Sequence, residues 1–110
     1  MKYTRLGAFE ELVLLTIGAL HEDAYGVAIK EEIESTTGKK PSIGALHSAL
    51  SRLEQKGFIQ SHEGGATALR GGRRKRYYLL TMAGQEALVG SRQLREKLIR
   101  RIPGLKLDIA

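Results

Sequence analysis

The sequence predicts a mainly α-helical fold with one small β-hairpin, and two observations lead to this prediction. Apolar residues recur at helical spacing in four segments, which are residues 8–21, 24–37, 43–56 and 82–102. Two runs with strand character, residues 58–63 and 75–80, lie between the third and fourth helices and flank glycine pairs that suit a hairpin tip. This order of elements is that of a winged helix-turn-helix followed by one further helix.

The first two helices are predicted to supply much of the core. The apolar face of the first comprises Phe9, Leu12, Val13, Ile17 and Leu20, widened by Leu14 and Leu15. So broad an apolar face predicts a helix that is largely buried and belongs to the core rather than to a cofactor site. Asp23 is the expected N-cap of the second helix, and Gly38 is its expected end. The inward face of this helix comprises Tyr25, Ile29 and Ile33.

The third helix is predicted to begin after Ser42, which can act as its N-cap, and to end before Gly57. Its inward stripe comprises Ile43, Leu46, Leu50 and Leu53. Its outward face comprises Gly44, Ala45, His47, Ser48, Ser51, Arg52 and Gln55. That face is small, polar and nearly free of acid, with Glu54 as the exception, which is typical of a helix that enters the major groove of DNA. A purely solvent-exposed helix more often carries Glu and Lys pairs.

The last helix is predicted from Met82, with Thr81 as its cap, to about Ile102, before Pro103 and Gly104. Its apolar stripe comprises Ala87, Leu94, Leu98 and Ile102. A chain of this size has little core left for a long terminal helix to cover, so we expect the stripe to pack against a second copy. The alternative is that it folds back on the first helix. We therefore divide the chain into a winged helix-turn-helix DNA-binding domain, residues 1–81, and a dimerisation helix with its tail, residues 82–110.

The positive charge of the chain is unevenly distributed. The net charge is +6, yet residues 1–55 hold six Lys and Arg against eight Asp and Glu, while residues 56–110 hold twelve against four. Residues 64–80 carry no acid, and their cations are Arg70, Arg73, Arg74, Lys75 and Arg76. This concentration of charge on one hairpin favours a polyanion as partner, although a solvated basic loop is the simpler alternative.

Several classes of function are disfavoured by what the sequence lacks. With no cysteine, the chain has neither disulfides nor thiolate sites, which suits a reducing cytoplasm. The three histidines show no metal-ligand spacing, and there is no phosphate-binding glycine loop. The longest apolar stretch, residues 12–20, is too short to span a membrane. We therefore expect a cytoplasmic protein that is not an enzyme, needs no cofactor and does not bind a membrane.

Several motifs in this order carry a resemblance to a known family. They are Tyr25-Gly26, the helix segment Gly44-Ala45-Leu46 with Ala49, Leu50, Arg52, Leu53, Glu54 and Gly57, then Arg74-Lys75-Arg76-Tyr77-Tyr78, Leu80-Thr81 and Ala83-Gly84. The chain resembles the PadR-like transcriptional regulators over residues 12–88, and its single terminal helix resembles their smaller branch. The resemblance implies a bacterial or archaeal repressor that dimerises through its C-terminal helix. The chain departs from the family in two places. Where family members commonly have Tyr-Pro, this chain has His47-Ser48. Some family members bind flat aromatic drugs between tryptophans at the dimer interface, but this chain has no tryptophan.

The residues expected to contact double-stranded DNA fall into two sets. Phosphate contacts are assigned to Lys39, Lys40, Arg52, Arg73, Arg74 and Arg76, and base contacts to Ser42, Gly44, Ala45, His47, Ser48 and Arg52. A two-fold dimer would place its recognition helices on an inverted repeat, with half-sites about 10 base pairs apart. The alternative is a winged-helix module that binds protein or RNA. A small-molecule effector between protomers stays open, since its candidate lining residues are equally explained by packing.

Overall fold

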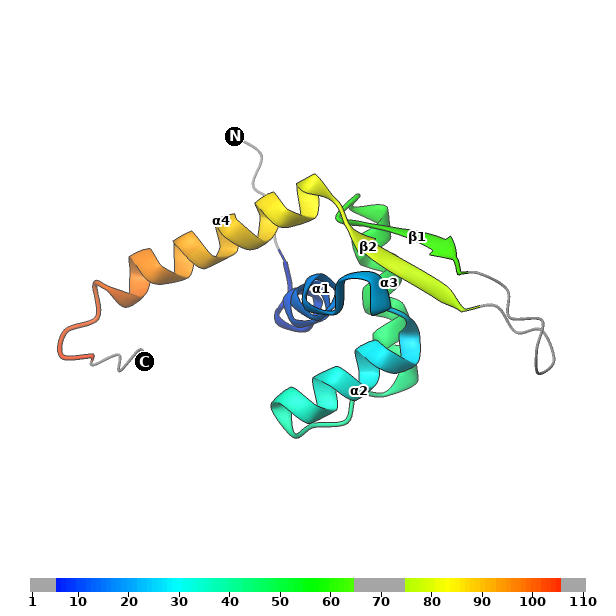
Figure 1. Cartoon of the computed structure of the whole chain (residues 1–110). Coiled ribbons are helices and arrows are strands. Elements are labelled where there is room, and N and C mark those ends of the chain that lie inside the picture. The colour runs from blue at the N-terminus through cyan, green and yellow to red at the C-terminus, as the bar shows by residue number, and fades with distance from the viewer. Residues whose placement is uncertain (1–5, 65–74, 106–110) are drawn as a thin grey trace.

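The computed structural model describes residues 6–64 and 75–105 (Figure 1). Its helices and strands, in chain order, are α1 (Ala8–Leu20), α2 (Gly26–Thr37), α3 (Ile43–Gln55), β1 (Ile59–Glu63), β2 (Arg76–Leu80) and α4 (Met82–Ile99). A short 3₁₀ turn, η1 (His21–Asp23), joins α1 to α2. The structure is therefore mainly helical with one hairpin, which confirms the predicted winged helix-turn-helix fold.

The core forms where α1 meets α2, α3 and the base of the hairpin, and α1 lies at its centre (Figure 1). The buried apolar side chains are Val13, Leu14, Ile17, Ala24, Ile29, Ile33, Leu46, Ala49, Leu50, Leu53, Phe58, Ile59 and Tyr78. They come from α1, α2, α3, both strands and the adjoining residues Ala24 and Phe58, whereas Ala87 and Leu88 of α4 are only partly buried against the cluster. The three helices and the hairpin thus form one body around α1, and α4 packs on it from outside.

The hairpin is held to the helical body by main-chain contacts. Strands β1 and β2 pair antiparallel with Ile59 opposite Leu80 and Glu63 opposite Arg76. The segment before α2 joins β2 as well, because the Tyr78 amide donates to the Ala24 carbonyl at 2.8 Å and Tyr25 forms an isolated bridge with Tyr77. The start of α2 and the root of the wing are therefore joined through the backbone.

Helix α4 begins at a tight junction with β1. The Thr81 hydroxyl accepts from the Gly84 amide at 3.0 Å, as expected of its N-cap, and donates to the Gly57 carbonyl at 2.7 Å. Gly84 is buried against the Phe58 carbonyl. Helix α4 then runs beside α1, and its far end extends away from the body on the side opposite the hairpin (Figure 1).

Four local predictions were wrong. Asp23 does not cap α2, because residues 21–23 form the 3₁₀ turn and Tyr25, held against β2, takes the N-cap position. Helix α4 ends at Ile99, three residues before the predicted end, in a run of turns that precedes Pro103. Two predicted core residues lie at the surface. Leu15 is 50% exposed beside α4, and Ile43 is 61% exposed because it lines an open groove between α2 and α3 rather than the core.

Candidate nucleic-acid interface

The outward face of α3 is as open as the sequence predicts. Ser42 caps the helix by accepting from the Ala45 amide at 3.0 Å. The exposed residues of this face are Gly44, Ala45, His47, Ser48, Ser51, Arg52 and Gln55. No atom lies within 4 Å of the place where a Cβ on Gly44 would sit, so packing does not require glycine there. Short side chains leave this face free for close approach to a flat or grooved partner.

Helix α3 is tied to α1 by a buried carboxylate that the sequence did not single out. Arg52 Nε donates to Glu10 Oε2 at 2.6 Å, and Lys56 Nζ donates to Glu10 Oε1 at 2.7 Å. The Glu10 side chain is 9% exposed, whereas that of Arg52 is 52% exposed. Arg52 is therefore a link within the fold, in addition to its predicted role at DNA.

The charge of Glu10 is stabilised by these partners. Burial alone would raise its pKa, but the hydrogen bonds from Lys56, Arg52 and the Gly7 amide outweigh that effect and lower the pKa to about 2 from 4.5. A carboxyl with a lowered folded-state pKa stabilises the fold above its unfolded pKa, and this contribution disappears as the pH falls from 4.5 towards 2.

Glu10→Gln is expected to lower the free energy of unfolding at pH 7 by about 1–2 kcal/mol, because two charge-assisted hydrogen bonds are weakened and one partner is half exposed. Urea denaturation between pH 2 and pH 7 should also show a shallower loss of stability below pH 4.5 than in the wild type. Glu22→Gln, at an exposed carboxylate, should keep the wild-type profile. Identical profiles for wild type and Glu10→Gln would contradict this role of Glu10.

The root of the wing is a cluster of rings and cations. The Tyr25 and Tyr77 rings meet edge to face, with 5.5 Å between their centroids. The His62 ring stacks on the Tyr77 ring, with 5.7 Å between their centroids. Lys75 Nζ lies 4.1 Å from the centroid of the Tyr25 ring. These contacts hold the described part of the wing beside the start of α2.

The described wing places two cations at the surface. Lys75 and Arg76 are both exposed, and Arg76 Nη1 donates to Ser61 Oγ at 2.7 Å. Ser61 in turn donates to Glu54 at 2.8 Å, so the single acid of the α3 face is hydrogen-bonded next to the guanidinium of Arg76. Arg73 and Arg74, also predicted to contact DNA, lie outside the described residues.

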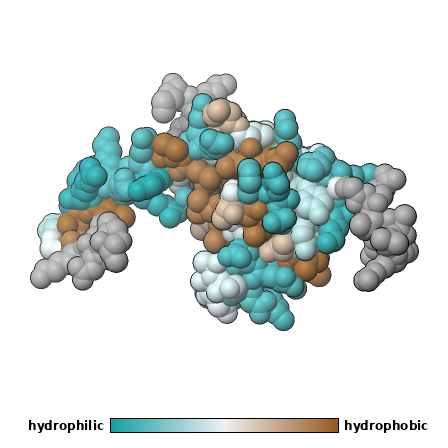
Figure 2. Space-filling model, in the orientation of Figure 1, coloured by the Kyte–Doolittle hydropathy of each residue, from teal (hydrophilic) through white to brown (hydrophobic). Residues whose placement is uncertain are grey.

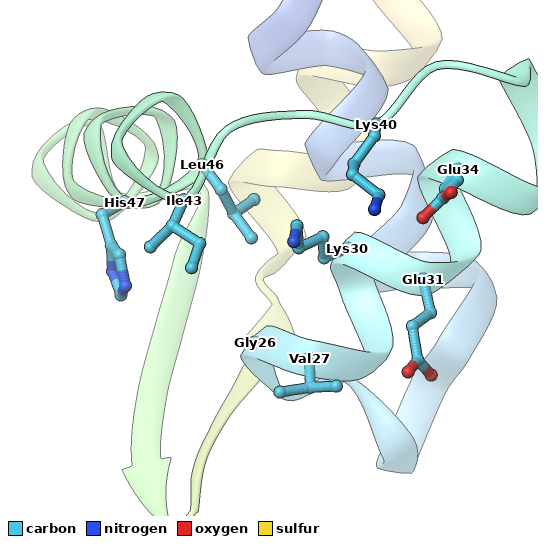
Figure 3. A pocket seen from close by; sticks show the side chains of 9 residues that line it. All are labelled: Gly26, Val27, Lys30, Glu31, Glu34, Lys40, Ile43, Leu46 and His47. Atoms are coloured by element: carbon cyan, nitrogen blue, oxygen red, sulfur yellow. The ribbon is translucent and has the colours of Figure 1, made fainter.

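A groove of ≈ 410 Å³ runs between α2 and α3 and opens next to the outward face of α3 (Figure 3). Val27 and Ile43 line it, and each is 61% exposed. Lys30, Lys40 and His47 also line it. Two of the residues predicted to contact DNA, Lys40 and His47, therefore line this groove. A third, Lys39, is exposed and precedes Lys40 in the chain. Helical periodicity did not identify Val27 and Ile43 as residues of an exposed groove. It predicts which face of a helix a residue occupies, but it does not show how much of the apolar face is covered by the rest of the core.

Helix α4 contacts α1 along part of its length. Arg95 Nη2 donates to Glu11 Oε1 at 2.5 Å, and Ser91 donates to the other oxygen of Glu11 at 3.0 Å. Ala87, predicted to face a second copy, is partly buried against the core of its own chain. The side of α4 that carries Ser91 and Arg95 thus folds back on α1, as in the alternative prediction.

The rest of the predicted stripe lies at the surface, on the second half of α4 and in the turns that follow it. Leu94, Leu98 and Ile102 are 42%, 51% and 49% exposed. A groove of ≈ 370 Å³ between α1 and α4 adds half-exposed Leu15 and Val89. Figure 2 shows apolar surface on the extended arm and where it joins the body. Exposed apolar side chains gathered in this way are common where proteins associate.

Metal-ligand clusters and membrane-crossing helices are both absent from residues 6–64 and 75–105. Within them, no group of three or more His, Cys, Asp or Glu side chains is placed to hold a metal ion. No helix in the same ranges has the length and apolarity that a bilayer crossing needs.

Comparison with known proteins agrees with the resemblance read from the sequence. The model of the transcriptional regulator PadR-like family matches residues 13–89. No curated protein matches the chain significantly. Among solved structures, the chain is similar to RosR of H. salinarum in the complex structure of hsRosR-S1, with 29% identity and a TM-score of 0.66, over 86% of this chain and 76% of that chain.

Two further structures extend the comparison. A transcriptional regulator from Clostridium thermocellum shares 25% identity with a TM-score of 0.64, over 86% of this chain and 91% of that chain. A PadR-like transcriptional regulator from Bacillus cereus shares 19% identity with a TM-score of 0.69, over 91% of this chain and 95% of that chain. At this level of identity, the similarity concerns the fold alone. The family and these two proteins are described as regulators of transcription. The family match includes the whole winged helix-turn-helix after the first turns of α1, and the chain therefore belongs to the PadR-like family of transcriptional regulators.

Proposed function

We propose that the protein is a sequence-specific binder of double-stranded DNA that acts as a homodimeric repressor in the cytoplasm. The observation that carries this proposal is the outward face of α3, which is exposed, small and polar and lies beside a cationic hairpin. Its one acid, Glu54, is hydrogen-bonded to Ser61 at the wing. A surface that bound another protein would be expected to expose an apolar patch across this face instead.

The proposed interface divides the work between backbone and base contacts. Lys39, Lys40 and Arg76, together with Arg73 and Arg74, would neutralise phosphates and release counterions. Ser42, Gly44, Ala45, His47 and Ser48 would approach the base edges of the major groove. Arg52 would serve both sets through the part of its guanidinium that Glu10 does not engage. Phosphate contacts supply affinity, and the base contacts supply the choice of sequence.

The proposed dimer uses the half-exposed stripe of Leu94, Leu98 and Ile102. In a two-fold pair, the stripe of each protomer would face the partner and cover the groove between α1 and α4. The two copies of α3 would then read an inverted repeat whose half-sites lie about 10 base pairs apart. Bound to an operator that overlaps a promoter, such a dimer would exclude RNA polymerase.

The function is tested by selecting duplexes from a random library and measuring their affinity at several salt concentrations. The selected duplex should be palindromic and should bind more tightly than random DNA or RNA of the same sequence. Arg74→Ala plus Arg76→Ala should weaken all duplexes alike and reduce the slope of log affinity against log salt by about one per lost contact.

Lys97→Ala plus Arg100→Ala is the charge-matched control, because it removes two exposed cations at the C-terminal end of α4, away from the wing. This control should keep the wild-type salt slope. A wild-type slope in the wing double variant would contradict the proposed wing contact, and equal affinity for RNA would contradict the proposed target.

A further inference from the structure

Two large apolar side chains are exposed on the side of the helix-turn-helix where DNA is proposed to bind. Ile43, the first residue of α3, and Val27, in the first turn of α2, are each 61% exposed and line the same groove. Neither side chain belongs to the core cluster, so the fold gains little from their being apolar. Apolar groups that face one groove from two helices mark a contact with an apolar part of a partner.

The surroundings of this pair indicate the chemistry of the partner. Lys30, Lys40 and His47 line the groove, and in Figure 3 Ile43 and His47 project from α3 to the same side. Two acids, Glu31 and Glu34, line it too, but in this view both lysines lie between them and Ile43. The partner at the Ile43 end is therefore an anionic molecule that carries a small apolar group. DNA has this combination, because the C5 methyl of thymine projects into a major groove bordered by phosphates.

We propose that Ile43, with Val27 as the opposite wall of the groove, reads the C5 methyl group of a thymine in each half-site. This inference rests on the proposed DNA-binding function and adds to it a specificity-determining residue that helical periodicity assigns to the core. Ile43 adjoins Gly44 and Ala45, whose small size allows the first turn of α3 to approach the bases. Lys30 and Lys40 would hold the phosphates that flank the same base step.

Thymine and uracil differ in this methyl group alone, so the test uses duplexes in which single thymidines of the selected operator are replaced by deoxyuridine. Wild-type protein should lose affinity about fourfold at one thymine per half-site, which corresponds to the about 0.8 kcal/mol of one buried methyl group. A duplex with cytosine in place of this thymine should bind the protein more weakly, and 5-methylcytosine at the same position should restore part of that affinity.

The variant Ile43→Ala should bind thymidine and deoxyuridine duplexes equally at that position while it still prefers the operator to random DNA. Ile43→Val should keep part of the discrimination. Met82→Ala, which removes an apolar side chain that is 68% exposed at the start of α4, is the matched control and should keep the full fourfold ratio. Circular dichroism confirms that each variant is folded.

The outcomes separate this inference from the proposed function. If wild-type protein selects an operator but no deoxyuridine replacement changes its affinity, the thymine contact is refuted and DNA recognition stands. The contact is equally refuted if Ile43→Ala keeps the fourfold ratio. If wild-type protein prefers no duplex over random DNA, the proposed function and this inference are both refuted.

Discussion

Leu94→Glu plus Leu98→Glu is expected to convert the proposed homodimer into a monomer and to reduce operator affinity by about 100-fold or more, since a linked pair of half-site binders gains that factor over a single one. Each leucine is about half exposed in the isolated chain. Burial of one such side chain stabilises an interface by up to about 1.5–3 kcal/mol, and two-fold symmetry doubles the loss. Buried, unpaired glutamates would oppose the association further.

Sedimentation velocity at micromolar concentration measures whether the variant is a monomer or a dimer. Separate titrations with the full palindrome and with a single half-site measure the loss of operator affinity. The double variant should bind the half-site as the wild type does. Gln85→Glu plus Gln93→Glu adds the same two charges at exposed positions of α4 outside the stripe of Leu94 and Leu98 and should remain dimeric. A dimeric Leu94→Glu plus Leu98→Glu variant with unchanged affinity would show that α4 does not form the interface.

Gly84→Ala is expected to lower the free energy of unfolding by about 3 kcal/mol, at the upper end of the usual cost of overpacking. A Cβ at this position would overlap the Phe58 carbonyl oxygen and would lie 2.8 Å from Leu80 Cδ1. The carbonyl oxygen belongs to the backbone, so the first turn of α4 would have to move away from β1. The hydrogen bonds of Thr81 at the same junction would be strained as well.

Thermal and urea unfolding measure this loss. The control is Gly44→Ala in α3, where no atom lies within 4 Å of the added carbon. It should be neutral or stabilising by up to about 1 kcal/mol, because alanine is the better helix former. Equal stabilities of the two variants would mean that Gly84 is not required by the close approach to β1.

The sequence predicts the elements of this fold well because their signals are local. Ser42 and Thr81 cap α3 and α4 as expected, and each accepts from the amide three residues ahead. The hairpin strands lie within one residue of their predicted ends. Periodicity also identifies the face of α3 that stays exposed, since residues at intervals of three and four must share a side.

The errors arise where distant segments decide the outcome. Ile43 follows the same spacing as Leu46, but it is the first residue of α3 and lies in the open groove beside α2 instead of in the core. The neighbouring acids Glu10 and Glu11 appear as a charged start of α1. Both are buried, because Arg52, Lys56 and Arg95, from 42 to 84 residues away, converge on them. No local pattern indicates such pairs.

The central claim is that the outward face of α3 lies against DNA bases, and a single introduced thiol tests it most directly. The chain has no cysteine of its own, so Ser48→Cys provides a unique thiol on that face. It can form a disulfide with an operator base that carries a thiol tether in the major groove, and Glu86→Cys on exposed α4 is the control. We expect rapid cross-linking at residue 48 at one base position per half-site and none at residue 86. Cross-linking that is absent at residue 48, or equal at both sites, would contradict this mode of binding.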